Sequence, residues 1–129
     1  MQCGNVAVLI GNGDGTFQAA QSYASGIRFA ASIAMSDVNS DGKLDLLVAN
    51  GCSLFSSSSV PHICGVGVLL GNGDGTFQPS QGYSSGGFGP DSIAVEDVNG
   101  DGKPDVIVSN ACVIPRDCGS GIVGVLLAN

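Results

Sequence analysis

The sequence repeats itself with a period of 60 residues, and this repeat restricts the fold more than any other feature. Residues 11–18, with the sequence GNGDGTFQ, recur unchanged as residues 71–78, and residues 37–39 recur as 97–99. A third copy begins at Val125. Repeats of this size are supersecondary units that bury their apolar faces against neighbouring copies. We therefore expect a stacked repeat architecture rather than one independent globular core.

Each repeat is predicted to contain four short antiparallel strands. Apolar runs occupy residues 6–10, 32–35 and 44–48 in the first copy and 66–70, 92–95 and 104–108 in the second. The glycine-rich stretches 11–15 and 71–75 favour hairpin turns, so return strands are expected to begin at residues 16–17 and 76–77. No segment has a sustained helical period. This pattern predicts an all-β fold built from β-propeller blades.

The phase of the repeat divides the chain into one propeller segment, 1–129, with three parts. Residues 1–31 are expected to end a preceding blade, 32–91 to form one full blade, and 92–129 to begin an incomplete following blade. Two repeats cannot close a ring, so further blades are expected. They would come from the rest of a longer chain or from other copies of this chain in a homo-oligomer.

An acidic loop occurs once in each repeat and has the spacing of a cation-binding loop. Oxygen-bearing side chains stand at loop positions 1, 3, 5 and 9, with glycine at position 6 for a sharp turn. The residues are Asp37, Asn39, Asp41, Gly42 and Asp45, then Asp97, Asn99, Asp101, Gly102 and Asp105. Calcium takes six to eight such oxygens in flexible geometry. The sequence therefore predicts two Ca²⁺ sites.

Position 7 of each loop is a lysine, Lys43 or Lys103, whose backbone carbonyl oxygen is the expected ligand. An EF-hand would need a glutamate at position 12, where this chain has Val48 or Val108, so the EF-hand is excluded. Magnesium is disfavoured because it prefers a tight octahedron that keeps several waters. A solvated acidic turn without metal is the alternative.

The charge balance supports this interpretation and excludes other partners. Four Lys and Arg residues stand against eleven Asp and Glu, a net charge of −7, so no basic surface for nucleic acid can form. Six of the eleven acids lie in the two predicted calcium loops. The apolar runs are far shorter than the roughly 20 residues that a membrane-spanning helix needs. Asp14 and Asp74 are expected to stabilise their hairpin turns.

Five cysteines suggest disulfides and an oxidising compartment. Cys52 and Cys64 bracket a loop in the first repeat, and Cys112 and Cys118 bracket the corresponding loop in the second. We expect the pairs Cys52–Cys64 and Cys112–Cys118, with the partner of Cys3 lying upstream. Buried reduced thiols are the alternative. Disulfides would place the protein outside the cell, either secreted or at the cell surface.

Residues 92–108 and 68–77 resemble the FG-GAP/VCBS repeat, a family found in integrin α-subunits and in many secreted bacterial proteins. The resemblance extends over nearly the whole chain. It implies a propeller of about six to eight blades, with calcium in the loop between the first two strands of a blade. The ligands that it implies are the loop residues named above. It also implies a binding or adhesion scaffold with a protein or glycan ligand.

Two further functions remain open in the sequence. A lectin-type propeller would bind carbohydrate between adjacent blades, and the chain could instead be a non-catalytic part of a secreted enzyme. Catalysis by the chain itself is not expected. His62 is the sole histidine, and no pairing of a nucleophile with a base is visible.

Overall fold

Antiparallel strands form all the regular secondary structure of the part of the chain that the computed structural model describes, residues 4–26, 29–51, 65–114 and 118–129. Within these ranges there is no helix that could cross a membrane. The strands are β1 (Asn5–Val8), β2 (Gln21–Ala24), β3 (Ala30–Ser36), β4 (Asp45–Asn50), β5 (Gly65–Leu69), β6 (Gln81–Ser84), β7 (Phe88–Glu96), β8 (Asp105–Cys112) and β9 (Ile122–Leu126).

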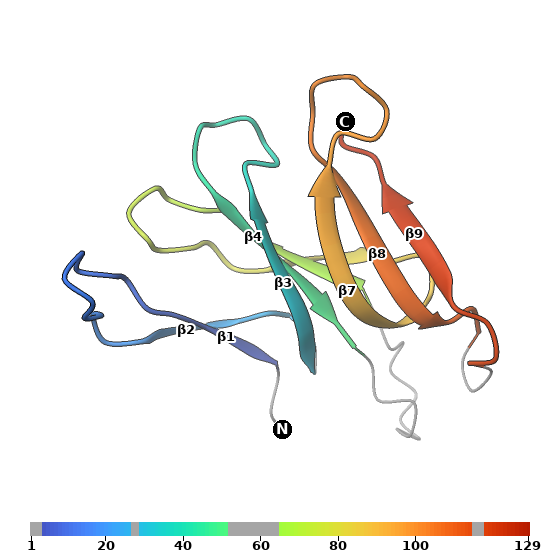
Figure 1. The fold of residues 1–129 in the computed structure, drawn as a ribbon, viewed down its shortest axis with the longest axis horizontal. Coiled ribbons are helices and arrows are strands. Elements are labelled where there is room, and N and C mark those ends of the chain that lie inside the picture. Colours follow the sequence, from blue (N-terminus) through green and yellow to red (C-terminus); the bar gives the residue numbers. More distant parts are fainter. Residues whose placement is uncertain (1–3, 27–28, 52–64, 115–117) are drawn as a thin grey trace.

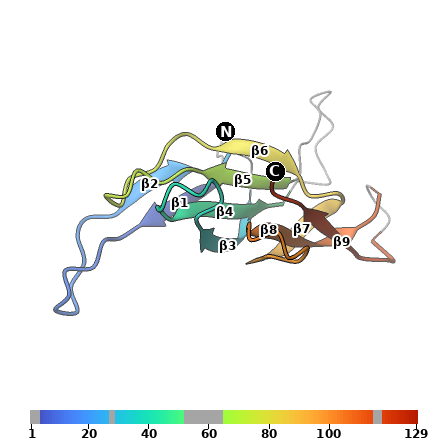
Figure 2. The same cartoon turned by 90° about the horizontal axis from the view of Figure 1, so that it is seen from above.

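Three antiparallel sheets stand in a row (Figures 1 and 2). Strands β1 and β2 form the first sheet, β3-β4-β5-β6 the second, and β7-β8-β9 the third. The all-β fold of blade-like sheets is therefore confirmed, and the described residues do not close a ring. The expected blade boundaries after residues 31 and 91 stay a prediction. The four-stranded sheet itself extends from Ala30 to Ser84.

The expected start of the return strands was wrong. Residues 16–17 and 76–77 belong to the hairpin tips, where Gly11 pairs with Phe17 and Gly71 with Phe77 through isolated bridges. The return strands β2 and β6 begin at Gln21 and Gln81. The outgoing arm advances three residues from Val68 to Gly71. The return arm advances four residues between their partners, from Phe77 to Gln81. This extra residue interrupts the ladder as a β-bulge does.

The middle sheet is covered on both faces, as the continuous apolar runs of its central strands predict. Successive residues of β4 point to opposite faces. Leu46 and Val48 pack with Val6 of the first sheet. Leu47, on the other face, packs in a cluster with Val108 of the third sheet. All six residues of β4 are consequently buried.

Buried polar contacts join each sheet to the next. Ser25, which follows β2, donates its hydroxyl proton to Asn50 Oδ1 on β4 at 2.7 Å, and Asn50 Nδ2 donates to the Ser25 carbonyl oxygen at 3.0 Å. Ser85 and Asn110 repeat both hydrogen bonds at 2.6 and 3.0 Å between the second and third sheets. Both Ser–Asn pairs are buried. Buried polar groups with satisfied hydrogen bonds fix one packing arrangement.

Replacing Asn50 with alanine should weaken the contact between the first two sheets. The change removes two buried hydrogen bonds of the Ser–Asn pair, so we expect the free energy of unfolding to fall by about 1–3 kcal/mol. Chemical denaturation measures this loss. Asn5→Ala is the matched control, since Asn5 is an exposed strand asparagine and should change stability by less than about 0.5 kcal/mol. Equal effects of the two variants would contradict the role of the pair.

Candidate calcium loops

The two acidic loops occupy equivalent places in neighbouring sheets. Residues 37–44 connect β3 to β4, and residues 97–104 connect β7 to β8. Both loops project from the same end of their sheets, at the top of Figure 1. The loops are therefore the connections between the first two strands of their sheets, where the family resemblance implies calcium.

In the first loop, the side chains at positions 1, 3 and 5 turn toward the loop backbone. The Asp37 carboxylate accepts hydrogen bonds from the N–H groups of Asp41 at 3.1 Å and Gly42 at 2.8 Å. Asn39 Oδ1 accepts from the same Asp41 N–H at 3.1 Å, and Asp41 Oδ1 accepts from the Lys43 N–H at 2.9 Å. Three oxygen-bearing side chains thus gather around one short stretch of backbone.

The second loop repeats this network. The Asp97 carboxylate accepts from the N–H groups of Asp101 at 3.1 Å and Gly102 at 2.8 Å. Asn99 Oδ1 accepts from Asp101 N–H at 3.0 Å, and Asp101 Oδ1 accepts from Lys103 N–H at 2.9 Å. The second loop has one further hydrogen bond, in which the Gly100 N–H donates to Asp97 Oδ1 at 2.7 Å. The shared spacing therefore produces the same local geometry twice.

The backbone of each loop turns through the left-handed region at positions 4 and 6. Gly42 and Gly102, at position 6, have φ values of 81° and 83°. Position 4 is Gly100 in the second loop, with φ of 76°, but Ser40 in the first, with φ of 60°. A residue with a side chain is uncommon there. The first loop accordingly carries a local backbone cost that the second avoids.

The position-9 acids, Asp45 and Asp105, have a separate structural task. Both are fully buried. The two oxygens of Asp45 accept hydrogen bonds from the N–H groups of Val38 at 3.0 Å and Gly71 at 2.8 Å. Asp105 accepts equivalently from Val98 N–H at 3.1 Å and Ala128 N–H at 2.8 Å. Each acid therefore ties its own loop to the chain just after the third strand of its sheet.

In each loop, the oxygens at positions 1, 3 and 5 suit a hard cation, whereas the position-9 carboxylate is directed elsewhere. The oxygens at positions 1, 3 and 5 share one loop, and carboxylate and amide oxygens are ligands that calcium prefers. The position-9 carboxylate points to backbone N–H groups instead, and no three acidic, histidine or cysteine side chains of the described residues form a metal-binding group. Lys43 Nζ lies 3.8 Å from Asp41 Oδ2. Such an exposed pair contributes little free energy.

Local hydrogen bonds lower the pKa of several exposed acids. The N–H of Lys103, the Asn99 side chain and the Lys103 charge lower the pKa of Asp101 below its ordinary value of 3.8. The Thr16 hydroxyl and N–H lower that of Asp14, and Thr76 does the same for Asp74. These bonds stabilise the charged form. The acids therefore remain ionised at neutral pH.

Asp14 and Asp74 stabilise their hairpin tips, as expected. Asp14 Oδ1 accepts from the Thr16 N–H at 2.9 Å and from its hydroxyl at 2.6 Å. Asp74 accepts from Thr76 at the same two distances. This is the side-chain-to-backbone bonding typical of turn aspartates. Neither acid belongs to the network of the acidic loops.

Cys112 at the end of β8 forms a disulfide with Cys118, and their Cα atoms lie 4.2 Å apart. The bond closes the connection between β8 and β9. The predicted Cys52–Cys64 pair and Cys3 lie outside the described residues.

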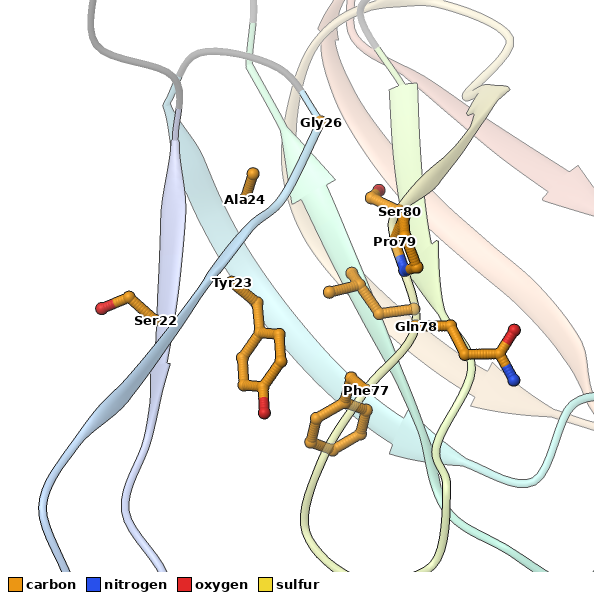
Figure 3. A pocket seen from close by; sticks show the side chains of 9 residues that line it. Ser22, Tyr23, Ala24, Gly26, Phe77, Gln78, Pro79 and Ser80 are labelled. Carbon is orange, nitrogen blue, oxygen red and sulfur yellow. The ribbon is translucent and has the colours of Figure 1, made fainter.

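A hollow of about 420 Å³ lies where the first sheet meets the β5–β6 hairpin (Figure 3). Its lining residues are Ser22, Tyr23, Ala24, Gly26, Leu69, Phe77, Gln78, Pro79 and Ser80. The rings of Tyr23 and Phe77 pack edge to face, with centroids 5.5 Å apart. In Figure 3 the side chains of Ser22 and Gln78 point away from the space between these rings. The hollow therefore presents mainly apolar atoms.

Two features of the structure were missed in the sequence: the buried role of the position-9 acids and the Ser–Asn pairs. A signal for the Ser–Asn pairs was present. Ser25 and Asn50 recur as Ser85 and Asn110 at the 60-residue period, and Asn50 directly follows the apolar residues 46–49 of β4. A polar residue repeated inside an apolar strand indicates a buried hydrogen-bond partner.

Replacing Asp45 with alanine should destabilise the protein even when calcium is chelated. Two buried backbone N–H groups lose their acceptor, which we expect to lower the free energy of unfolding by about 2–4 kcal/mol. Urea denaturation in EGTA measures the loss. The control is Asp91→Ala, at an exposed position of β7. An unchanged stability of the Asp45 variant in EGTA would show that the buried hydrogen bonds do not matter.

Replacing Thr76 with alanine should raise the pKa of Asp74 toward 3.8, because the hydroxyl donor that most lowers this pKa is removed. The folded-state pKa lies below the ordinary value, so the tip interaction is fully present above about pH 4 and is lost as the pH falls further. Titration of the carboxyl carbon by NMR follows the change. Asp14, whose Thr16 is intact, is the internal control, and parallel shifts of both acids would contradict the assignment.

Comparison with known proteins gives one family. A family model described as the FG-GAP-like repeat matches residues 2–48 and 54–108. Searches of curated proteins and of solved structures returned no match. The two matched segments make up most of the chain, and their ends at residues 48 and 108 lie one 60-residue period apart. The chain therefore belongs to the FG-GAP-like repeat family.

Proposed function

We propose that the chain is a calcium-binding, extracellular β-propeller repeat module that serves as a binding or adhesion scaffold. The observation that carries the calcium proposal is the gathering of three oxygen-bearing side chains in each acidic loop. In both loops, the side chains at positions 1, 3 and 5 accept hydrogen bonds from the backbone N–H groups of positions 5, 6 and 7. Equivalent hydrogen-bond lengths in the two loops agree within about 0.1 Å. The repeated spacing gathers carboxylate and amide oxygens in both copies, and these are the ligands that calcium prefers.

The proposed ligands of the first ion are Asp37, Asn39, Asp41, the Lys43 carbonyl oxygen and Asp45. Asp97, Asn99, Asp101, the Lys103 carbonyl oxygen and Asp105 would bind the second. The position-9 carboxylates can take part because each oxygen of an ionised carboxylate has two acceptor sites, and one hydrogen bond uses only one of them. Two bound ions would change the formal charge from −7 to −3. Relief of repulsion among the clustered acids is the physical gain.

An extracellular location is supported by two chemical features. The Cys112–Cys118 disulfide is typical of oxidising compartments. Extracellular calcium-binding modules have dissociation constants of about 10⁻⁴–10⁻³ M, and we expect these loops to bind in that range. Such sites fill at the calcium concentrations found outside cells.

The scaffold role rests on family membership, and the proposed partners are further blades together with a protein or glycan ligand. Exposed apolar side chains at the third sheet support the need for another blade. Val123 of β9 is 62% exposed, whereas Val66, its equivalent on β5, is fully buried against the third sheet. A blade placed there in the same way would bury Val123. We assign no catalytic role to the module.

The lectin alternative has a weaker basis. A glycan site needs polar groups directed at the ligand as well as an aromatic face. The hollow between the first two sheets offers the aromatic rings of Tyr23 and Phe77, but these rings pack against each other. The polar side chains of Ser22 and Gln78 point away from the space between the rings (Figure 3). No specific observation on the described residues favours the other alternative, that the chain is a non-catalytic part of a secreted enzyme.

Calcium should raise the melting temperature of the chelated protein. At ten times the dissociation constant, each site is expected to add about 1.4 kcal/mol to the free energy of unfolding. Thermal melts in EGTA and in millimolar CaCl₂ measure the effect, with MgCl₂ at matched ionic strength for comparison.

The double variant Asp41→Ala and Asp101→Ala should lose most of this calcium response. Asp74→Ala is the matched control. It removes an exposed acid that lies in the β5–β6 hairpin tip and outside both acidic loops. It should keep the full response. Identical melts with calcium and with EGTA would refute the calcium proposal.

A further inference from the structure

The tetrapeptide Asn-Gly-Asp-Gly occurs three times in the chain, at residues 12–15, 72–75 and 99–102. Asparagine is a chemically labile residue. When glycine follows it, the glycine nitrogen can attack the asparagine side-chain carbonyl carbon without an enzyme, because no Cβ crowds the approach. The local sequence would make these three sites equally reactive, so a difference between them must come from the fold.

The third copy lies in the acidic loop between β7 and β8, and its asparagine side chain is folded forward along the chain. Asn99 Oδ1 accepts a hydrogen bond from the Asp101 N–H at 3.0 Å, and Asn99 Nδ2 donates to Asp101 Oδ2 at 3.1 Å. Both bonds reach the residue that follows Gly100. The amide is therefore turned along the Gly100 backbone, and holding two reacting groups close together speeds their reaction.

The two hairpin-tip copies hold their asparagines differently. Asn12 Nδ2 donates to Thr16 Oγ1 at 2.8 Å, and Asn72 Nδ2 donates to Thr76 Oγ1 at 2.9 Å. These bonds direct each amide to the opposite arm of its hairpin. The tip sites consequently have the glycine without the forward-folded side chain.

The first acidic loop has the forward-folded side chain without the glycine. Asn39 bonds to Asp41 through the same pair of atoms, with Oδ1 accepting at 3.1 Å and Nδ2 donating at 3.3 Å. The next residue is Ser40. Its side chain crowds the backbone nitrogen that would have to attack. Of these four asparagines, Asn99 therefore combines both requirements.

We propose that Asn99 is a site of spontaneous deamidation. The Gly100 nitrogen bonds to Asn99 Cγ, the Cγ–Nδ2 bond breaks, and a five-membered succinimide ring forms. The Gly100 N–H donates to Asp97 Oδ1 at 2.7 Å, and this carboxylate accepts the proton as the nitrogen attacks. The Asp101 N–H stabilises the negative charge that develops on Oδ1. The amide nitrogen leaves as ammonia with the transferred proton.

Water completes the reaction by opening the ring at either of its two C–N bonds, which leaves aspartate or isoaspartate at position 99. The consequence for the second calcium loop rests on the proposed function. Aspartate adds a carboxylate at loop position 3, and the number of charged ligands tunes calcium affinity. Isoaspartate lengthens the backbone between positions 3 and 4. Because Asn39 keeps its amide, the two calcium sites become different as the protein ages.

Incubation of the full chain in EGTA and heavy-oxygen water tests the proposal. Peptide mapping by mass spectrometry identifies each converted asparagine by the oxygen that it takes up. In the folded protein we expect Asn99 to convert about tenfold faster than Asn12, Asn72 or Asn39. In urea the three Asn-Gly sites should convert at one common rate, since only the fold distinguishes them. Equal rates at these three sites in the folded protein would overturn the inference.

Reciprocal substitutions test the requirement for glycine. Gly100→Ser should slow conversion at Asn99 to the rate of Asn39, and Ser40→Gly should raise conversion at Asn39 to the original rate of Asn99. The hairpin-tip sites in the same sample are the matched control for folding, because they convert faster only when the chain unfolds. A folded Ser40→Gly variant whose Asn39 stays unconverted would contradict the inference.

Calcium separates this inference from the proposed function. At ten times the dissociation constant, only about one tenth of the sites are empty, so bound calcium should slow conversion at Asn99 about tenfold. The hairpin-tip rates should not change. Fast conversion of Asn99 with and without CaCl₂ would refute Asn99 as a calcium ligand and leave the deamidation site intact. Conversion in EGTA no faster than at the tips would refute deamidation and leave the calcium proposal intact.

Discussion

The packing of one sheet against the next depends on a buried hydrogen-bonded pair that recurs along the chain. Ser25 with Asn50, and Ser85 with Asn110, exchange hydrogen bonds in the interior between neighbouring sheets. The hydrophobic clusters on either side of β4 lie between the same sheets that these pairs join. Because each pair needs the serine carbonyl to approach a third strand closely, Gly67 and Gly124 follow from the same constraint.

The acidic loops depend on this packing through Asp45 and Asp105. Each of these acids is the buried first residue of the second strand of its sheet, and it accepts hydrogen bonds from its loop and from the chain that leaves the third strand. The side chains at positions 1, 3 and 5 are arranged locally, by Asx-type bonds to nearby N–H groups. The proposed ion would therefore bind at a junction of local and tertiary structure. Its stabilising effect would reach the third strand as well as the loop.

Much of the fold could be predicted because the repeat aligns two copies of every element. The central strands β4, β5 and β8 lie where the apolar runs are, since β4 and β5 pack on both faces and β8 packs with the face toward the second sheet. The return strands β2 and β6 could not be located in this way. They are mostly exposed and polar, so their place depends on pairing with β1 and β5 and on the bulge that precedes them. Similarly, the loop spacing predicts the candidate ligands at positions 1, 3 and 5, but it does not reveal that Asp45 and Asp105 are buried.

The sequence alone determined the repeat, the all-β class, the hairpin turns stabilised by Asp14 and Asp74, and the two acidic loops. These depend on residues that are close along the chain, so their spacing contains the information. Only the tertiary structure decided that Ser25 and Asn50 meet and that Gly67 lies close to the Ser25 carbonyl oxygen. These residues lie on different sheets. Their contacts exist only after hydrophobic burial has brought the faces of β4 against both neighbours.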